Sequence, residues 1–278
     1  MTESPQYPIE FKEGSEAHYR DGLAYDRRYR HRRADVDYYV GLAQRWGGPV
    51  LELGVGTARV ARRIAECGHD VVGVDGMPAM LAQARTQLGK ASRRVRERVQ
   101  LVQHDLRQLN LDRQFPLVLA PFNVFMHLYT RADIENALAS VRRHLAPNGC
   151  LAFDVSNPDP RMLARDPTRV YRCRPVVQPR SGKRYLYREA FHYDGPSQVL
   201  HISMIMENPT DETDVQMTAL SQRQFFPAEL EMLLQYNGFQ LMVMHGGFCG
   251  EDLCGDSESL VVEAQLNKDL LAPSLRGR

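Results

Sequence analysis

The chain has 278 residues, of which 43% are hydrophobic and 25% are charged, close to the average for globular domains. A chain of this length buries about three quarters of the surface that it exposes when unfolded, so it needs no disulfide or metal to fold. Its 35 basic and 34 acidic residues leave a net charge of +1. This balance excludes a global field that would gather nucleic acid or an anionic membrane.

Hydropathy and cysteine usage indicate a cytoplasmic protein. No apolar run approaches the roughly 20 residues that span a bilayer. Residues 1–10 lack the basic start and apolar core of a signal peptide. The cysteines are odd in number and scattered, which is typical of free thiols in a reducing compartment: Cys67, Cys150, Cys173, Cys249 and Cys254.

Residues 1–47 are polar, with aromatic side chains spread among them. From Ala34 to Trp46 the apolar residues recur at helical spacing, which predicts a helix that enters the main domain. A basic cluster precedes it, formed by Arg27, Arg28, Arg30, Arg32 and Arg33. We interpret residues 1–47 as a helical lid over a small-molecule site. A nucleic-acid patch is the alternative, but no comparable basic surface follows.

Residues 48–160 alternate between short apolar runs and helical patterns. The expected strands are 49–53, 70–74, 99–103, 115–120 and 150–155. Expected helices include 78–89, which has Pro78 in its first turn, and 131–145, which Pro147-Asn148-Gly149 should end. Nearly all-apolar strands that alternate with helices predict a parallel sheet covered on both faces.

The rhythm changes at residues 161–223. Apolar and polar residues alternate in 185–192 and 199–206, and a turn sequence separates the two runs at 194–197. This pattern predicts an antiparallel β insertion. The chain then returns to the core at 224–266, with a helix from Pro227 to about Gly238 and strands at 239–245 and 259–265.

The first predicted strand ends in a glycine loop, Val50-Leu51-Glu52-Leu53-Gly54-Val55-Gly56-Thr57-Ala58-Arg59. A strand that runs into Gly-x-Gly and opens a helix brings its backbone close to a ligand, because glycine has no Cβ. An acid, Asp75, ends the next strand, 21 residues beyond Gly54.

Two cofactor classes use such a site. Dinucleotide-binding loops have a third glycine that allows close helix–strand packing, and here that position holds Arg59. The acid Glu52 would also lie unfavourably against a pyrophosphate, whereas it suits a cation. S-adenosylmethionine has a sulfonium, an ammonium and no phosphate, so the loop favours this cofactor over a nicotinamide.

The segment from Glu52 to Ala58 resembles the first motif of the class I S-adenosylmethionine-dependent methyltransferases, and the resemblance extends over the main domain. It implies a Rossmann-like α/β fold, with seven mostly parallel strands and a closing antiparallel hairpin. Asp75 matches the ribose-binding acid, Met80 lies where an adenine packs, and Asp105 is expected to take the adenine amine. The cofactor-binding residues expected on this basis are Glu52, Gly54, Gly56, Thr57, Arg59, Asp75, Gly76, Met80, Asp105, Leu106, Pro121, Tyr25 and Arg33, the last pairing with the cofactor carboxylate. Ala58 departs from the family, which more often has glycine there.

The acceptor should bind at the carboxyl ends of the strands, beside the sulfonium. The expected substrate-binding residues are Phe122, Asn123, Met126, Tyr129 and Asn157. His127 is the candidate base because its ordinary pKa lies near 6.5, and a buried structural histidine is the alternative. His245, Cys249 and Cys254 have irregular spacing and no fourth ligand nearby, so we expect no metal.

The insertion resembles that of natural-product methyltransferases, including glycopeptide and amino-sugar N-methyltransferases, in which it roofs the acceptor site and often joins two subunits. We therefore expect methyl transfer to a nitrogen or oxygen of a small natural product, in an enzyme that forms a homodimer. One alternative is an inactive S-adenosylmethionine-binding scaffold. Another is a nucleic-acid methyltransferase, although Leu119-Ala120-Pro121-Phe122 lacks that class's polar residue before Pro-Pro-aromatic.

Overall fold

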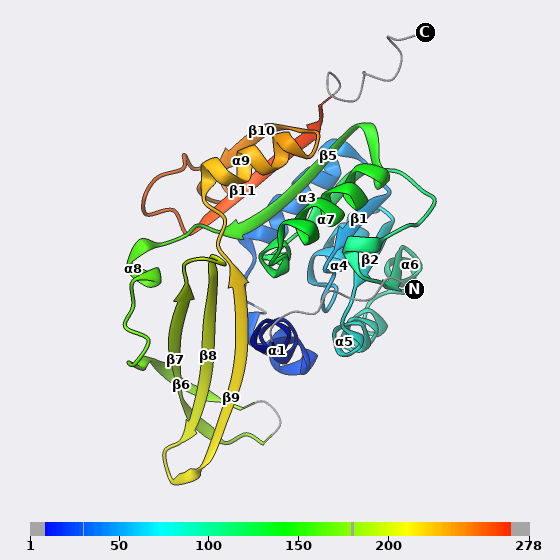
Figure 1. The fold of residues 1–278 in the computed structure, drawn as a ribbon. Coiled ribbons are helices and arrows are strands. Elements are labelled where there is room, and N and C mark those ends of the chain that lie inside the picture. Colours follow the sequence, from blue (N-terminus) through cyan, green and yellow to red (C-terminus); the bar gives the residue numbers. More distant parts are fainter. Residues whose placement is uncertain (1–8, 30, 179–180, 268–278) are drawn as a thin grey trace.

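The structure is a computed structural model and describes residues 9–29, 31–178 and 181–267. It consists of a seven-stranded sheet flanked by helices and a separate four-stranded sheet (Figure 1). Within the described residues, no helix has both the length and the apolar character required to cross a bilayer. Arg30 of the basic cluster and the first eight residues of the expected lid lie outside the described residues.

The seven-stranded sheet has the order β10-β11-β5-β4-β1-β2-β3. Its strands are β1 (Val50–Leu53), β2 (Val71–Asp75), β3 (Val99–Gln103), β4 (Phe115–Ala120), β5 (Leu145–Ser156), β10 (Phe239–His245) and β11 (Ser259–Leu266). Strands β1 to β5 pair in parallel, whereas β11 is antiparallel to both of its neighbours. The predicted α/β fold, parallel core and closing hairpin are thus confirmed, and the carboxyl ends of β1 to β4 meet at one edge.

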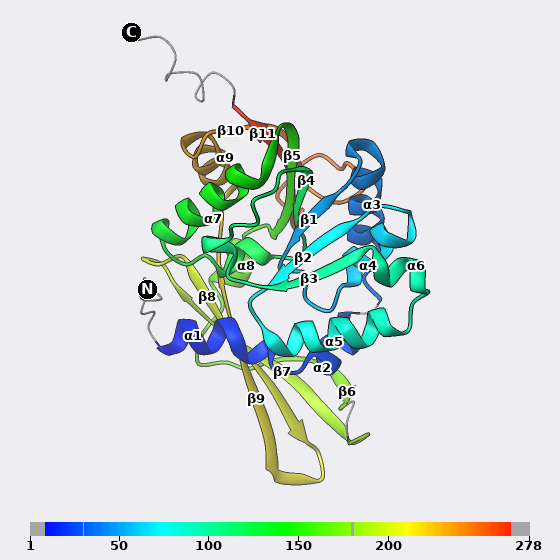
Figure 2. The ribbon, with the colours of Figure 1, turned by 90° about the vertical axis from the view of Figure 1, so that its right-hand side faces the viewer.

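Helices cover both faces of this sheet, and Figure 2 shows α7 and α9 on one side and α3 and α4 on the other. The helices of the core are α3 (Ala34–Trp46), α4 (Arg59–Glu66), α5 (Pro78–Gly89), α6 (Arg93–Glu97), α7 (Arg131–His144) and α9 (Pro227–Tyr236), with the short turns η2 (Leu106–Gln108) and η3 (Val124–His127). Leu51 and Leu53 of β1 join the core under α7 and α9, while Val50 joins the core under α3, α4 and α5. The strands are therefore apolar on both faces, as a doubly covered sheet requires.

One predicted boundary is wrong. Pro147-Asn148-Gly149 does not separate a helix from a strand, because α7 ends at His144 and β5 begins directly at Leu145. The register between β4 and β5 shifts after the Phe115–Leu145 pair, and Pro147 lies exposed in this irregular stretch. Proline is tolerated where a strand bulges because no ladder hydrogen bond is required of it there.

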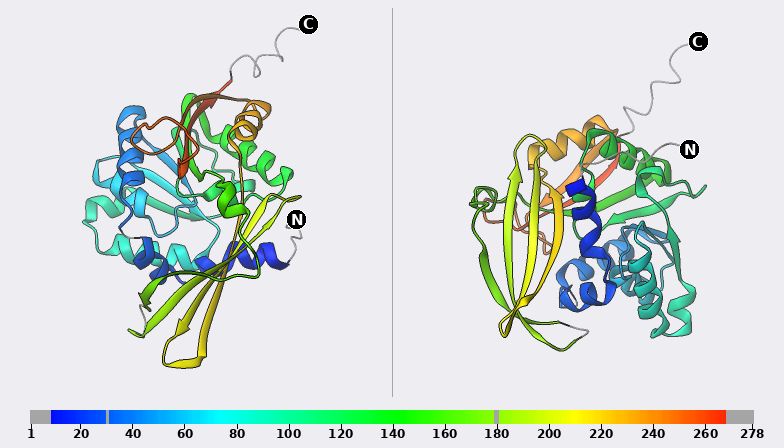
Figure 3. Two further views of the ribbon diagram at one scale, coloured as in Figure 1. Left: turned by 90° about the vertical axis from the view of Figure 1, so that its left-hand side faces the viewer. Right: turned by 60° about the horizontal axis from the view of Figure 1, so that its bottom comes forward.

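The insertion is an antiparallel meander with the order β6-β7-β8-β9. It follows α8 (Pro160–Leu163) and comprises β6 (Tyr171–Val177), β7 (Arg184–Asp194), β8 (Val199–Asn208) and β9 (Asp211–Arg223). The two runs with period two fall in β7 and β8. The N-terminal segments α1 (Ile9–Glu16), η1 (Ala17–Tyr19) and α2 (Gly22–Tyr29) precede α3, and α1 lies between the insertion and the main sheet (Figure 3).

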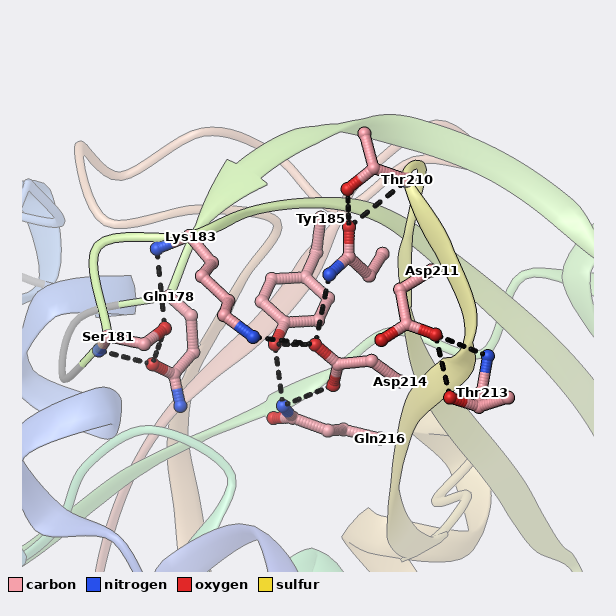
Figure 4. Close-up of polar contacts among 10 residues, drawn as sticks. Gln178, Ser181, Lys183, Tyr185, Thr210, Asp211, Thr213, Asp214 and Gln216 are labelled. Carbon is pink, nitrogen blue, oxygen red and sulfur yellow. Dashed lines mark hydrogen bonds and ion pairs between the residues drawn. The ribbon is translucent and has the colours of Figure 1, made fainter.

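A polar cluster holds the outer end of the insertion together (Figure 4). The Asp214 carboxylate accepts hydrogen bonds from Asn208 Nδ2 at 3.0 Å and from the Tyr185 hydroxyl at 2.8 Å, and it lies 3.3 Å from Lys183 Nζ. These donors lower the pKa of Asp214 to about 2. Side chains of β7, β8 and β9 thus meet at one carboxylate, which ties the strand ends together.

Candidate functional site

A cavity of about 480 Å³ opens at the carboxyl ends of β1 to β4, within the size range of small-molecule sites. Most of the predicted site residues line it: Tyr25, Gly54, Gly56, Asp75, Gly76, Met80, Asp105, Leu106, Pro121, Phe122, His127 and Tyr129. They converge because each follows a parallel strand or belongs to a segment that covers this edge of the sheet.

The glycine loop has a left-handed backbone at two glycines, which disfavours any side chain there. Gly54 has a φ of +64°, and a Cβ there would lie 2.4 Å from Cγ2 of Val124. Gly56 has a φ of +55°, and its Cβ would lie 3.4 Å from the Met80 methyl. Ala58 also adopts left-handed geometry, with a φ of +62°, so the departure from glycine leaves a strained residue before α4.

Asp75 links the loop to the end of β2. One carboxylate oxygen accepts the Gly56 N–H at 2.8 Å and the other accepts the Met77 N–H at 2.7 Å. Burial raises the pKa of this carboxyl, while the two N–H groups oppose the shift. Each oxygen accepts only one of these bonds, so lone pairs remain for the two hydroxyls of a ribose. The acid and the open loop together suit an adenosine.

Asp105 lies on the cavity wall, but Arg107 already binds both of its oxygens. The Arg107 Nε and Nη2 atoms lie 2.9 and 2.6 Å from the two carboxylate oxygens. Burial alone would raise the pKa of Asp105, and the Arg107 hydrogen bonds instead hold it below its usual value. An adenine amine at this position would share the carboxylate with Arg107.

Glu52 was expected to face the cofactor, and the structure places it behind the loop instead. It is 2% exposed, does not line the cavity, and its Oε2 has no hydrogen-bond partner within the described part of the chain. Burial raises the pKa of Glu52 to about 8, so the side chain is mostly protonated at neutral pH. All four residues of β1 are buried, and none of them lines the cavity.

Thr57, Arg59 and Arg33 lie on a second cavity of about 670 Å³, which shares the wall residue Tyr25 with the first. Arg59 makes two hydrogen bonds to the buried Asp35, at 2.9 and 2.6 Å, and thereby joins α4 to α3. Arg33 is exposed at the start of α3. The arginine expected to hold the cofactor carboxylate therefore lies outside the first cavity.

Aromatic side chains form the wall at the β4 end of the cavity. Phe122 lies beside Tyr25 and Tyr29, and the centroid of its ring is 4.8 Å from that of Tyr29. Phe122 and Asn123 both have left-handed backbones, with φ of +63° and +66°. Such residues cost about 1–3 kcal/mol each and persist only when their surroundings hold them.

His127 belongs to a chain of hydrogen bonds that fixes its tautomer. The Tyr129 hydroxyl donates to the Ser221 carbonyl at 3.0 Å, so its oxygen is left to accept from His127 Nδ1 at 3.3 Å. The unprotonated Nε2 then accepts from the Tyr19 hydroxyl at 2.6 Å. Burial lowers the pKa of His127 to about 4, so the imidazole is neutral at physiological pH.

Three predicted acceptor residues lie off the cavity wall. Met126 is fully buried in the core, and Asn157 donates its amide to the Ser257 carbonyl at 2.9 Å, which fixes the loop before β11. Asn123 is the N-cap residue of η3 and shapes the turn through its backbone. Only some side chains of the short η3 turn reach the cavity, and residue type alone does not predict which ones.

The sequence reasoning missed the wall that α1 and η1 contribute. Ser15, Glu16 and Tyr19 line the cavity from this side. No motif or periodicity marks these positions, although Tyr19 is one of the aromatics spread through the polar segment. Among the residues described, no group of three or more His, Cys, Asp or Glu side chains is arranged to hold a metal ion.

Comparisons with known proteins agree on the family. Residues 50–149 match the family model described as a methyltransferase domain. The putative methyltransferase YqeM of Bacillus subtilis is 27% identical over 81% of this chain and 87% of its own length.

Solved structures extend the similarity to nearly the whole chain. The CcbJ methyltransferase of Streptomyces caelestis is 23% identical, covers 91% of this chain and 99% of its own, and superposes with a TM-score of 0.78. The glycopeptide N-methyltransferase MtfA, bound to sinefungin, is 25% identical over 84% of this chain and 86% of its own, with a TM-score of 0.59, and it has also been solved with S-adenosyl-L-methionine. The chain therefore contains a methyltransferase domain at residues 50–149, and over nearly its whole length it is similar to methyltransferases that include the S-adenosylmethionine-binding MtfA.

Proposed function

We propose that this methyltransferase acts on an amine nitrogen of a small natural product, and that Tyr19 and His127 orient this amine. The observation that supports the proposal most strongly is the hydrogen-bond chain from Tyr19 through His127 and Tyr129 to the Ser221 carbonyl. Glycopeptide N-methylation by the similar MtfA is consistent with it.

The cofactor-binding role belongs to the wall of the first cavity. S-adenosylmethionine, when bound, supplies an activated methyl group. Asp75 accepts the ribose hydroxyls, Met80 packs against the adenine, and Asp105 shares its carboxylate between Arg107 and the adenine amine. Gly54, Gly56, Gly76, Leu106, Pro121 and Tyr25 complete the contact surface.

Tyr19 supplies the contact to the acceptor. Its proton points to His127 Nε2, so its oxygen is left to accept an N–H from the acceptor. An amine that donates this N–H keeps its own lone pair free to attack the methyl group. Orientation of two reactants can contribute about 7–11 kcal/mol, so methyl transfer to a neutral amine needs no strong base.

The same chain of hydrogen bonds favours nitrogen over oxygen as the acceptor. An alcohol has to lose its proton to become a good nucleophile, and a buried imidazole with a pKa of about 4 is a weak base for that task. A neutral amine already presents its lone pair. His127 is therefore proposed as the catalytic partner of Tyr19 in orientation, and the methylated ammonium releases its proton to water after it leaves the site.

The test is a screen of matched acceptors. Purified protein and S-adenosylmethionine are incubated with amino sugars, amino acids and short peptides, each beside its hydroxyl counterpart, and S-adenosylhomocysteine and the methylated product are measured by mass spectrometry. Methylation of an amine, with its hydroxyl counterpart unchanged, is the expected result. Methylation of the hydroxyl compound at an equal or higher rate would contradict the choice of nitrogen.

The insertion at 161–223 supports the acceptor side of the cavity. Tyr187, Met204 and Leu220 form a small core against which Tyr19 packs, and β9 provides the Ser221 carbonyl. We infer that the insertion roofs the acceptor site, while residues 1–47 act as the lid and residues 48–160 and 224–266 as the cofactor-binding core.

The outer face of the insertion supports a homodimer. Val177, Val215 and Met217 are 60%, 51% and 71% exposed, and the strand register places all three on one face of the sheet. A second copy that covers this face would remove the apolar patch from water. Light scattering of the wild type and of Met217→Glu tests this directly: a dimer that the substitution weakens is expected, and a wild-type monomer would contradict it.

Cysteine chemistry supports a cytoplasmic location. Cys67, Cys150, Cys249 and Cys254 are all free thiols, and the side chain of Cys173 lies outside the described part. Free thiols persist in a reducing compartment. Neither the near-neutral charge nor the small cavity suggests a nucleic-acid or membrane partner.

A further inference from the structure

We propose that Asp154, a residue of β5 behind the cavity wall, is a positioning residue for methyl transfer. It acts by holding the turn formed by Phe122 and Asn123 at the end of β4. The inference rests on the methyltransferase activity and does not depend on whether the acceptor atom is nitrogen or oxygen.

Asp154 holds both residues of the turn. Its Oδ1 accepts the Phe122 N–H at 2.7 Å, and its backbone carbonyl accepts the Asn123 N–H at 3.1 Å. The same Oδ1 also accepts the Tyr39 hydroxyl of α3 at 2.6 Å. One residue therefore joins the turn to the interior strand β5 and, through Tyr39, to helix α3.

The turn requires stabilising hydrogen bonds because both of its residues have left-handed backbones. Residues other than glycine adopt this backbone geometry only when surrounding contacts impose it. Phe122 lies on the cavity wall, and η3, which ends at His127, starts immediately after Asn123. A relaxed turn would therefore displace the aromatic wall and the Tyr19–His127 contact together.

The environment of Asp154 indicates a role beyond core packing. The residue is 1% exposed, yet Oδ2 has no hydrogen-bond partner within the described residues. A buried carboxylate oxygen without a partner destabilises a fold, whereas an apolar side chain in an apolar strand would stabilise it. Asp154 is thus unfavourable for stability, but its Oδ1 can accept the two hydrogen bonds from Phe122 and Tyr39.

The experiment compares Asp154→Ala with Asp154→Asn, and Asp194→Ala serves as the matched control. Asn retains an oxygen acceptor for Phe122 and Tyr39, whereas Ala removes it. Asp194 also holds a turn, by accepting the Ser197 N–H, but lies in the insertion hairpin. Hydrogen exchange of a peptide covering residues 119–125, S-adenosylhomocysteine affinity, and the kcat and KM with the acceptor found by the screen are measured for each variant.

Asp154→Ala is expected to raise the exchange of the Phe122 and Asn123 amides at least tenfold and to lower kcat at least tenfold. The affinity for S-adenosylhomocysteine should stay within threefold, and Asp154→Asn should recover most of the kcat. Adding Asn123→Gly to Asp154→Ala should restore kcat at least threefold, because glycine adopts the left-handed geometry without help. A role in core packing alone would give no such rescue.

Unchanged amide exchange in Asp154→Ala, a loss of kcat no larger than in Asp194→Ala, or the absence of rescue by Asn123→Gly would each overturn the proposal. If Asp154→Ala does not fold, Asp154→Ser, whose hydroxyl is too short to reach the Phe122 N–H, takes its place. Faster exchange at Phe122 with a lower kcat then supports the proposal, and equal exchange or an unchanged kcat contradicts it. If the screen yields no acceptor, the amine proposal fails separately, and the exchange and affinity measurements still decide the role of Asp154.

Discussion

The hydroxyl of Tyr19 lies 2.6 Å from Nε2 of His127, although 108 positions separate the two residues in the chain. The contact joins the η1 turn of the N-terminal segment to the η3 turn that follows β4. Tyr187, Met204 and Leu220 of the insertion pack around Tyr19. The N-terminal segment, the core and the insertion therefore meet at this one hydrogen bond.

Tyr19→Phe removes the hydroxyl and keeps the ring. We expect kcat to fall about 10- to 100-fold with the selected acceptor, because the contact that orients the amine is lost. The affinity for S-adenosylhomocysteine should stay within threefold. Tyr38→Phe is the matched control, since its hydroxyl binds Glu263 away from the cavity. A Tyr19→Phe enzyme as active as Tyr38→Phe would contradict the role of the hydroxyl.

Two half-buried histidines should make the folded state sensitive to acid. Burial lowers the pKa of His127 to about 4 and that of His18 to about 3, and the Arg28 charge adds to the shift of His18. Because the folded-state pKa lies below the unfolded value of about 6.5, each histidine contributes stability above pH 6.5 and loses it as the pH falls toward 4. At pH 5 the loss amounts to roughly 2 kcal/mol per histidine.

Urea unfolding at pH 7.5 and pH 5 measures this loss. The wild type should lose more free energy of unfolding between the two pH values than His18→Asn or His127→Asn does, since neither variant has to keep that imidazole neutral. Equal losses in the wild type and both variants would show that the two histidines titrate normally.

Glu52 should behave in the opposite way. Burial raises its pKa to about 8, above the unfolded value, so its contribution to stability is full below pH 4.5 and is lost as the pH rises through 8. Glu52→Gln removes the ionisation and keeps the shape. Between pH 7 and pH 9 the wild type should therefore lose roughly 1 kcal/mol more free energy of unfolding than the variant loses. A variant with the same pH dependence as the wild type would place the titration elsewhere.

Gly54→Ala tests the shape of the loop. The left-handed φ makes any side chain unfavourable, and the new Cβ would also meet Val124 at 2.4 Å. Gly182→Ala is the control for the backbone cost alone, because Gly182 has a φ of +70° and open space around it. We expect Gly54→Ala to lose about 1–3 kcal/mol more free energy of unfolding than the control. Similar losses would mean that Val124 moves aside without cost.

The main sheet could be predicted because its strands are apolar runs between turn signals, and strands β1 to β4 in parallel bring Gly54, Asp75, Asp105 and Pro121 to one edge. Tyr19 could not be predicted, since a polar segment without periodicity does not show which aromatic turns inward. Arg33 was predicted to bind the cofactor carboxylate, but the sequence does not show in which direction a side chain points at the start of a helix. Asp154 left a visible signal, a lone acid inside the apolar run Cys150–Val155, that the sequence reasoning did not use.

The central claim is that the first cavity binds S-adenosylmethionine through Asp75, and calorimetric titration with S-adenosylhomocysteine tests it most directly. The wild type should bind one equivalent and show no binding of NAD. Asp75→Ala should weaken the affinity at least tenfold, about 1.4 kcal/mol. Asp70→Ala, which changes the residue directly before the other end of β2, should leave the affinity unchanged. Binding of NAD, or an Asp75→Ala variant with wild-type affinity, would contradict the account.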